Sequence, residues 1–412
     1  MTASAFALIA GIALSSAPRV EHEVSARSEG RLRLMSGEGD AQDTELALQP
    51  RAEVLLDWET ATAQVSYAPQ LNVRELLGPR NVELLHLGEL GFTFSPNRTT
   101  TVRLSEELGY GEYRFNVLGG SLGSGSGAPV DGPQLPTGGA GQAPGAGGLP
   151  PRDVINFVRS NTRLNADFQL SRRLTLTTSA GWEISGGADA PSREQMPLQR
   201  GPFTEVGLSL QRSRFDVLSS AISYLDRSVV GGSRVSLGGL RVAYQRDLDR
   251  STDLMLSAGA GVGRERQDGG AWTPWSLYPE ARVGLSRQFR FGDQRLAANV
   301  TGQFTPSINP FTAALEKRVE ARAGLDWSRG DLLRSGLHAT ASTPVLGGAE
   351  DRQQLALLGA NAGVRLTDWS ELEASLGWSW ERDAREGPPR RQWLAGIAFV
   401  ATTGSSRSSA RR

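Results

Sequence analysis

The sequence predicts an all-β chain that folds as a transmembrane, antiparallel, up-and-down β-barrel of about 18 strands, with about 16 strands as the alternative. Three observations support this fold. Apolar and polar residues alternate with a period of two through most of the chain after residue 20. The alternating segments are mostly about 9–15 residues long, close to the length of a tilted strand that crosses a bilayer. The connections between the segments are alternately short and long, as in a barrel with short turns at one rim.

Residues 1–17 are predicted to be a signal peptide. The run Ala5–Leu14 is apolar and has the length of a signal-peptide core, and small residues follow it. No Lys or Arg precedes this run, and Pro18 is a poor residue to follow a cleavage site, so the cleavage position stays open. The alternative is a short apolar segment that interacts with a membrane.

The first alternating segments show the pattern most clearly. After a segment at about 20–35, residues 44–59 read TELALQPRAEVLLDWE, and the alternation resumes at residue 63 after a break at Thr60–Thr62. Because successive side chains of a strand point to opposite faces, each segment has one apolar and one charged face. In the segment 44–59 the apolar face carries Leu46, Leu48, Ala52, Val54, Leu56 and Trp58, and the charged face carries Glu45, Gln49, Arg51, Glu53, Asp57 and Glu59.

The same alternation continues to the end of the chain. A soluble sandwich, propeller or solenoid is the alternative, but its strands are usually about 5–6 residues long. Segments 203–226 and 332–342 alternate less cleanly, which leaves the lower strand count open. Later apolar faces include Val102, Leu104, Leu108 and Tyr110, then Leu164, Ala166, Phe168 and Leu170, then Val319, Ala321, Ala323, Leu325 and Trp327, and then Leu372, Ala374, Leu376, Trp378 and Trp380.

Connection lengths test the barrel hypothesis independently of the alternation. If the first segment starts on the periplasmic side, every long connection is extracellular and both termini are periplasmic. Short connections are predicted near Thr60–Thr62, Ser95–Thr99, Ser171–Arg173, Gln211–Arg214, Arg246–Ser251, Arg287–Gln294, Ser328–Asp331 and Thr367–Ser370, and long ones at 36–43, 75–81, 186–202, 226–233, 264–275, 306–316, 343–353 and 382–391.

The longest connection, 117–152, is rich in Gly and Pro. Residues 119–151 read GGSLGSGSGAPVDGPQLPTGGAGQAPGAGGLPP, with Asp131 as the sole charge. A linker between domains would separate unlike halves, but the alternation is the same on both sides. The composition predicts a disordered extracellular loop of a single barrel, and a soft lid over its mouth is one role open to it.

Aromatic residues lie near the ends of the segments on the apolar face. Interfacial aromatic girdles of membrane barrels have this placement, whereas ordinary cross-strand packing explains single cases only. The predicted interface aromatics are Trp58, Tyr110, Trp182, Trp275, Trp327, Trp378 and Trp380.

On these patterns, residues 20–401 resemble the bacterial outer-membrane β-barrels of the porin-like kind. The resemblance implies a location in the outer membrane and a lipid bilayer as partner. The last predicted strand ends near Phe399, and the tail 402–412, TTGSSRSSARR, is expected in the periplasm. Many barrels of this class end on an aromatic residue, so here either Phe399 serves as an internal insertion signal or the tail is tolerated.

The charged face is predicted to line a water-filled lumen, because about 18 strands enclose more space than side chains fill. Charges of opposite sign on neighbouring strands either pair and stiffen the wall or bind polar solutes in the pore. The candidate pore-lining residues are Arg51, Glu53, Asp57, Arg103, Glu107, Arg159, Arg163, Asp167, Arg241, Glu280, Arg282, Arg318, Glu320, Arg322, Arg365, Glu371 and Glu373.

Several classes of function lack support in the sequence. There is no cysteine, and the three histidines are His22, His86 and His338, so neither a metal site nor a cofactor is predicted. His338 is the one inward histidine in a clear segment, and no Ser/His/Asp spacing surrounds it, so no catalytic residues are proposed. The formal net charge of zero gives no reason to expect nucleic acid as a partner.

The remaining hypothesis is a pore that passes a polar solute or polymer. A weaker resemblance, in size and strand number, links the chain to the barrels of exopolysaccharide-export systems, which implies a polysaccharide cargo and a periplasmic export protein as partner. A general diffusion porin is the alternative. An outer-membrane hydrolase or a structural barrel is a second alternative.

Overall fold

The computed structural model describes residues 18–36, 41–74, 81–113, 155–266, 270–308, 315–346, 354–382 and 389–404. The predicted signal peptide 1–17, the loop 117–152 and the tail from residue 405 lie outside these residues. Almost every described residue belongs to a strand. The strands are β1 Arg19–Ser36, β2 Ala41–Asp57, β3 Ala61–Tyr67, β4 Gln70–Arg74, β5 Asn81–Asn97, β6 Thr100–Tyr113, β7 Ile155–Gln169, β8 Leu174–Gly187, β9 Gln199–Gln211, β10 Asp216–Val229, β11 Arg234–Asp247, β12 Thr252–Arg266, β13 Ser276–Phe291, β14 Gln294–Ile308, β15 Leu315–Arg329, β16 Leu333–Leu346, β17 Gln354–Thr367, β18 Ser370–Arg382 and β19 Arg390–Gly404.

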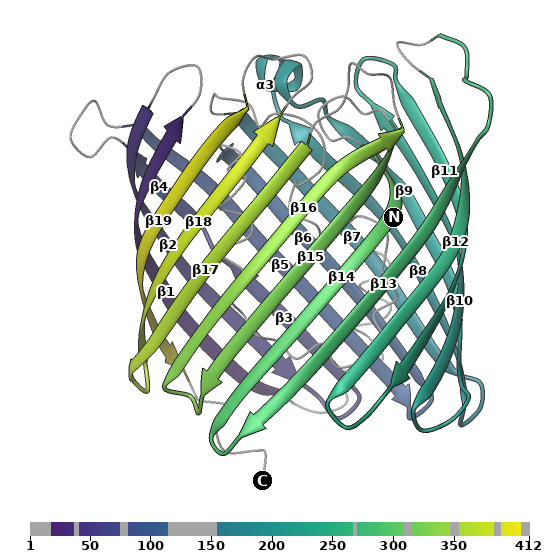
Figure 1. Ribbon diagram of the computed structural model, residues 1–412, viewed down its shortest axis with the longest axis horizontal. Helices are drawn as coiled ribbons and strands as arrows, with labels where there is room; N and C mark the ends of the chain where they lie inside the picture. The colour runs from purple at the N-terminus through teal and green to yellow at the C-terminus, as the bar shows by residue number, and fades with distance from the viewer. Residues whose placement is uncertain are drawn as a thin grey trace.

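The strands form one closed antiparallel barrel (Figure 1). Each strand pairs with its neighbours in the chain, and β1 closes the sheet by pairing with both β2 and β19. In the closing ladder, Glu23 lies opposite Gly404 and Ser36 lies opposite Arg391, so the last strand extends beyond the expected end at residue 401. The barrel predicted from the alternation is confirmed.

The barrel has 18 crossings although 19 strands are numbered. β3 and β4 are two parts of one crossing, since both pair with β2 on one side and with β5 on the other. Pro69 interrupts the crossing because proline has no N–H to donate to the ladder, while the Ala68 amide still donates to the Leu87 carbonyl at 2.9 Å. The less regular segments 203–226 and 332–342 also form strands. The barrel therefore has the 18 strands predicted rather than the alternative of 16.

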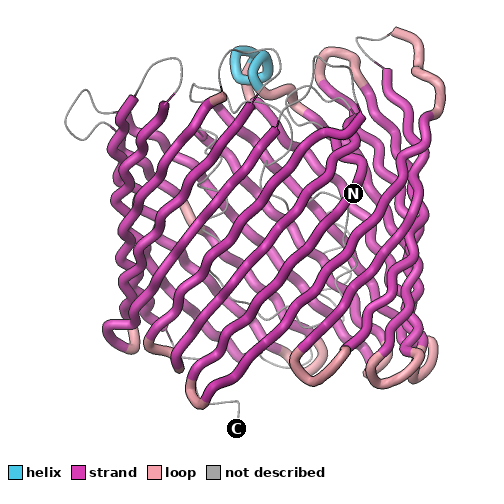
Figure 2. Tube along the Cα trace, viewed as in Figure 1, coloured by secondary structure: helices cyan, strands magenta, loops and turns pink. Residues whose placement is uncertain are grey.

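The two rims differ as predicted. Tight turns join the strands at one rim, and the longer connections lie at the other (Figure 2). Gly292 and Gly330 turn the chain at the short rim with φ of 64° and 52°, a conformation that favours glycine. The connection between β8 and β9 at the long rim contains α3 (Ala190–Gln195), the one helix among the described residues. No helix there is long and apolar enough to cross a membrane.

One face of the sheet is apolar and exposed. Directly opposed residues of an antiparallel ladder lie on the same face, so the register follows each face around the barrel. Ile222, Leu240 and Ile397 belong to the apolar face and are 65%, 54% and 64% exposed. A face of large exposed apolar side chains is typical of a wall in contact with lipid. The opposite, polar face therefore surrounds the lumen.

Buried apolar residues form small clusters on the lumen side. Leu355, Leu357 and Leu394 form one of them, on β17 and β19. Met196, which follows α3, packs against Ile155 and Phe157 of β7. This contact fixes the α3 connection against the lumen side of the wall at the long rim.

Candidate functional site

The candidate site is the polar inner wall of the barrel. Following the register from strand to strand places all the predicted pore-lining residues on this one face. For example, Arg282 lies opposite Gln303, and Gln303 lies opposite Glu320 on the next strand. On β6 and β7, Arg103 lies opposite Asn165 and Ser105 lies opposite Arg163, so both arginines are on this face. The role of these residues in the passage of a solute stays a prediction.

Many of the inner charges are neutralised by a neighbouring strand. Arg103 contacts Asp167 at 2.6 Å between β6 and β7, and Arg159 contacts Glu107 at 2.8 Å between the same strands. Within β15, Arg322 pairs with Glu320, which also accepts a hydrogen bond from Gln303 of β14 at 2.9 Å. These contacts agree with the wall-stiffening interpretation of the charges.

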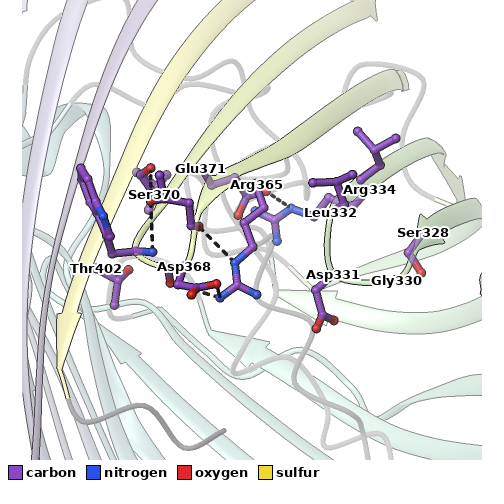
Figure 3. A pocket seen from close by; sticks show the side chains of 14 residues that line it. Ser328, Gly330, Asp331, Leu332, Arg334, Arg365, Asp368, Ser370, Glu371 and Thr402 are labelled. Atoms are coloured by element: carbon purple, nitrogen blue, oxygen red, sulfur yellow. Dashed lines mark hydrogen bonds and ion pairs between the residues drawn. The ribbon is translucent and has the colours of Figure 1, made fainter.

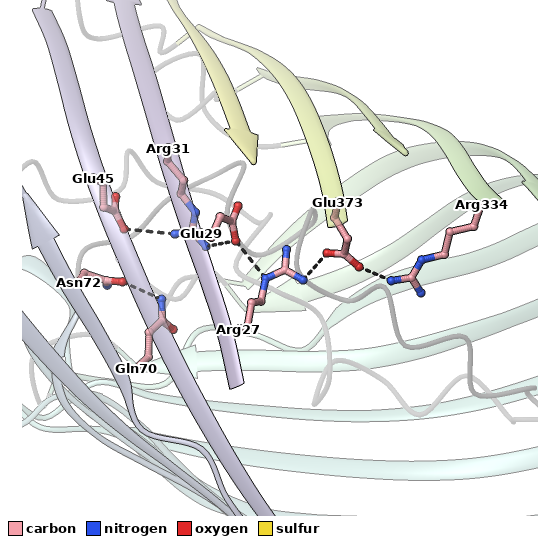
Figure 4. Close-up of polar contacts among 8 residues, drawn as sticks. All are labelled: Arg27, Glu29, Arg31, Glu45, Gln70, Asn72, Arg334 and Glu373. Atoms are coloured by element: carbon pink, nitrogen blue, oxygen red, sulfur yellow. Dashed lines mark hydrogen bonds and ion pairs between the residues drawn. The ribbon is translucent and has the colours of Figure 1, made fainter. Parts of the chain in front are cut away.

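A longer chain of ion pairs crosses the point where the barrel closes (Figure 4). It joins β2, β1, β18 and β16, and skips β19 and β17. Each contact is between an arginine and a carboxylate. The chain runs from Glu45 to Arg31 at 3.2 Å, to Glu29 at 3.0 Å, to Arg27 at 3.1 Å, and then to Glu373 and Arg334.

Small residues on the skipped strands make these contacts possible. A Cβ added to Gly363 of β17 would meet the Glu371 carboxylate and would lie 2.9 Å from Arg334 Nε. A Cβ added to Gly396 of β19 would lie 2.9 Å from Glu29 Oε1. Glycine therefore leaves room for long side chains to reach over one strand to the next but one.

The sequence missed most of this network. Arg27, Glu29, Arg31, Glu45 and Arg334 were not among the predicted pore-lining residues, although each lies on the charged side of an alternating segment. Alternation identified their face, but the pairing depends on the register across the closing ladder, which single segments do not contain.

The opposite part of the wall carries charges of both signs. Arg241 of β11 contacts Glu205 of β9 at 3.4 Å. Arg282 of β13 makes no ion pair with a described residue, and its Nε has no hydrogen-bond partner there. The charges of Arg322 and Arg241 both act on Arg282, and the charge of Glu320 acts on it with the opposite sign. This arrangement leaves a positive group available to an anion in the lumen.

A polar pocket of about 470 Å³ lies at the short rim, between the turns of β15–β16 and β17–β18 (Figure 3). Arg365 shapes it by donating to the carbonyls of Thr367 and Asp368 at 3.2 and 3.1 Å. Arg334 reaches the pocket as well and contacts Glu371 at 2.6 Å. The pocket therefore belongs to the same inner network, at its short-rim end.

The predicted interface aromatics lie at or near the outer wall. Tyr110, Trp182, Trp327, Trp378 and Trp380 are on the apolar face by register. Trp378 packs against Trp393 of β19 with ring centroids 6.3 Å apart. The other two predicted residues lie just outside strands, Trp58 after β2 and Trp275 before β13.

His338 faces the lumen on β16 and lies over Gly359 of β17, where an added Cβ would meet its ring. Its Nε2 is buried without a hydrogen-bond partner among the described residues. Among all the described residues, no group of three or more His, Asp or Glu side chains is placed to hold a metal ion.

Several solved structures are similar to this chain over most of its length, at low sequence identity. OpdL of Pseudomonas aeruginosa is 12% identical, with a TM-score of 0.46, and the alignment covers 94% of this chain and 99% of that one. OccK2 (OpdF) of the same organism, solved in complex with glucuronate, is 12% identical with a TM-score of 0.45 and coverages of 93% and 98%. OccAB4 of Acinetobacter baumannii is 9% identical with a TM-score of 0.47 and coverages of 95% and 99%.

No curated protein matches the chain. A family model does match, over residues 12–405, which include every strand. With its apolar exterior and polar lumen, the closed barrel is an outer-membrane pore for polar solute or polymer. The chain belongs to the EpsX exopolysaccharide export family.

Proposed function

We propose that this barrel is the outer-membrane channel through which an exopolysaccharide leaves the cell. One observation carries the proposal: the export-family match covers residues 12–405, and the described residues in this range form the barrel. Among the described residues, the matched range contains no folded unit besides the barrel that could perform the export step. The lumen is then the path of the polymer.

The chemistry of the wall supports this role. A sugar polymer has to slide along many groups without binding tightly to any of them. Charges that are already paired within the wall, such as Arg103 with Asp167, offer hydrogen bonds but little net attraction. Arg282, which makes no ion pair with a described residue, favours a polymer that carries carboxylates or other anionic groups.

The periplasmic partner would meet the barrel at the short rim. The pocket there combines Asp331 and Asp368 with the exposed Trp369, which is 54% exposed. An exposed aromatic beside charged groups is common at protein–protein contacts. A periplasmic export protein that docks here would deliver the polymer directly into the lumen.

We also propose that the chain acts without catalysing a reaction. His338 is the one inward histidine on the described strands, and its ring is held over Gly359 rather than beside a serine. His338→Ala is therefore expected to leave export unchanged. Loss of export together with loss of a hydrolytic activity would favour the hydrolase alternative.

The test is a deletion strain complemented with the wild-type chain or with matched variants. Gly239 and Gly238 are neighbours on β11, and by register Gly239 faces the lumen and Gly238 the lipid. Export of polymer to the cell surface should fall with Gly239→Trp and stay normal with Gly238→Trp, with both proteins inserted in the outer membrane. Normal surface polymer in the deletion strain would overturn the proposal, and a defect limited to small-solute uptake would favour a diffusion porin.

A further inference from the structure

A group of arginines lies on the outer wall at the long rim. Arg264 and Arg266 of β12 and Arg234 of β11 are close in the ladder, where Arg234 is opposite Arg266 and Ser236 is opposite Arg264. Val235, the residue between Arg234 and Ser236, shares the inner face with Arg227. The three arginines therefore face away from the lumen, at the long rim. We call Arg234, Arg264, Arg266, Trp272 and Trp275 the rim patch.

The connection after β12 turns back and holds two tryptophans against these arginines. The Thr273 amide donates to the Glu265 carbonyl at 2.8 Å, and the Glu265 amide donates to Thr273 Oγ1 at 2.9 Å. The Arg264 guanidinium lies 4.3 Å from the ring centroid of Trp272 and 4.5 Å from that of Trp275. Stacking on two rings fixes the plane of the Arg264 guanidinium and leaves its edge N–H groups to donate outward.

Among the described residues, two of the three arginines have no carboxylate partner. Arg234 is held by Asp226, with Nε to Oδ1 at 2.9 Å and a second bond to Oδ2 at 2.5 Å. Arg264 and Arg266 make no ion pair with any described residue, and the Nε of each is buried without an acceptor there. The patch thus carries uncompensated positive charge and unsatisfied donors.

Apolar surface begins directly below the patch on the same outer face. Val262 lies two residues before Arg264 on the same face of β12 and is 48% exposed. Leu277 of β13, opposite Val262, is 63% exposed. Leu240 continues this surface on β11 and lies near the middle of the wall. A molecule with an anionic head and long apolar chains would match the cationic rim and the apolar wall together.

We propose that the rim patch binds the phosphate headgroup of an outer-leaflet lipid. Long connections of outer-membrane barrels are extracellular, so the lipid that reaches this rim belongs to the outer leaflet. Arginine recognises phosphate through parallel N–H donors, and the stacked Arg264 presents such an edge beside Arg266. The acyl chains of the lipid would lie along Val262 and Leu277. The site is separate from the lumen and does not depend on the transported polymer.

The test measures lipid binding to the full-length protein in detergent by native mass spectrometry. Diphosphorylated lipid A, lipid A without phosphate, phosphatidylcholine and inorganic phosphate are added separately. The double variant R264Q/R266Q is compared with R246Q/R287Q, which removes two outward arginines at the opposite rim. Gel mobility before and after heating, together with channel conductance, checks that each variant is a folded pore.

Diphosphorylated lipid A should bind the wild type and R246Q/R287Q equally. R264Q/R266Q should bind it about tenfold more weakly, because charge-assisted contacts to phosphate are among the strongest polar contacts. Lipid A without phosphate should bind all three proteins weakly, as should phosphatidylcholine, because its choline cation offsets the charge of its phosphate. Equal binding by both double variants overturns the proposal, as does binding of inorganic phosphate as tight as that of the lipid.

Discussion

Arg27 of the first strand forms an ion pair with Glu373 of β18, across the intervening last strand β19. The pair joins the two ends of the chain at the ladder that closes the barrel. β19 itself contributes small or apolar inward residues there, such as Ala398 and Gly396. The closure is therefore supported by backbone hydrogen bonds of β19 and by charged side chains of its two neighbours.

Arg27→Gln should weaken the closure. Arg27 and Glu373 are 25% and 17% exposed, so the carboxylate would lose a donor in a place that water reaches poorly. We expect a loss of about 1–3 kcal/mol in the free energy of unfolding, measured by urea titration in detergent. Arg103→Gln is the control, because its pair with Asp167 is 51% and 30% exposed and should contribute less than about 1 kcal/mol. Equal losses for both variants would contradict this role.

Gly363→Val should disturb the same ion-pair network, because Gly363 lies on β17, one of the strands that the network crosses. The new side chain would occupy the space of the Arg334 and Glu371 side chains, so we expect a loss of about 1–3 kcal/mol. The control is Gly30→Ala, because an added Cβ at Gly30 meets nothing within 4 Å. Urea unfolding of both variants checks the prediction, which an unaffected Gly363→Val would refute.

Arg282→Glu should change the ion selectivity of the pore. The substitution reverses the charge of the cation on which Arg241 and Arg322 act. One unit charge at about 4 Å in water is worth about 1 kcal/mol, or about a fivefold change in local ion occupancy. The reversal potential in a salt gradient should move toward cation preference. Arg287→Gln, on the outer wall, should leave the reversal potential unchanged. An unchanged reversal potential with Arg282→Glu would show that Arg282 does not contribute to ion selectivity.

The α3 connection should stay ordered down to strongly acidic pH. Asp189 caps α3, and hydrogen bonds from Ser192 and Asn156 lower the pKa of its carboxyl from its usual value of 3.8 to about 2. Because the folded pKa is lowered, the stabilisation by Asp189 is fully present above about pH 4 and is lost as the pH falls through about 2. Pepsin cleavage within 188–198 should therefore increase only near pH 2. Asp189→Ala should be cleaved at pH 4 as well, and equal cleavage of both proteins at pH 4 would contradict the capping role.

Local pattern was sufficient to predict the strands and their faces. Alternation depends on the two-residue period of a single strand, so segments such as 44–59 could be recognised one at a time. The break at Pro69 was not predicted, because the alternation of polar and apolar residues continues in the same phase on both sides of it. The ladder shows that β3 and β4 share their neighbours and make one crossing.

Contacts between strands could not be predicted in the same way. Arg27 and Glu373 are separated by 346 positions, and their contact needs the closing register and the small residues of β19. Arg264 was not singled out either, since its stacking depends on how the connection 270–275 folds back on β12. Both features arise from tertiary geometry rather than from periodicity.

The most direct test of the central claim is the current through the purified barrel in a planar bilayer, before and after addition of the cell's own exopolysaccharide to the short-rim side. We expect an open, steady conductance that is interrupted by blockades as polymer chains enter the lumen. An unrelated neutral polymer of similar size should cause fewer blockades. No conductance at any voltage would contradict the pore, and a conductance that the exopolysaccharide leaves unchanged would contradict its role as the export channel.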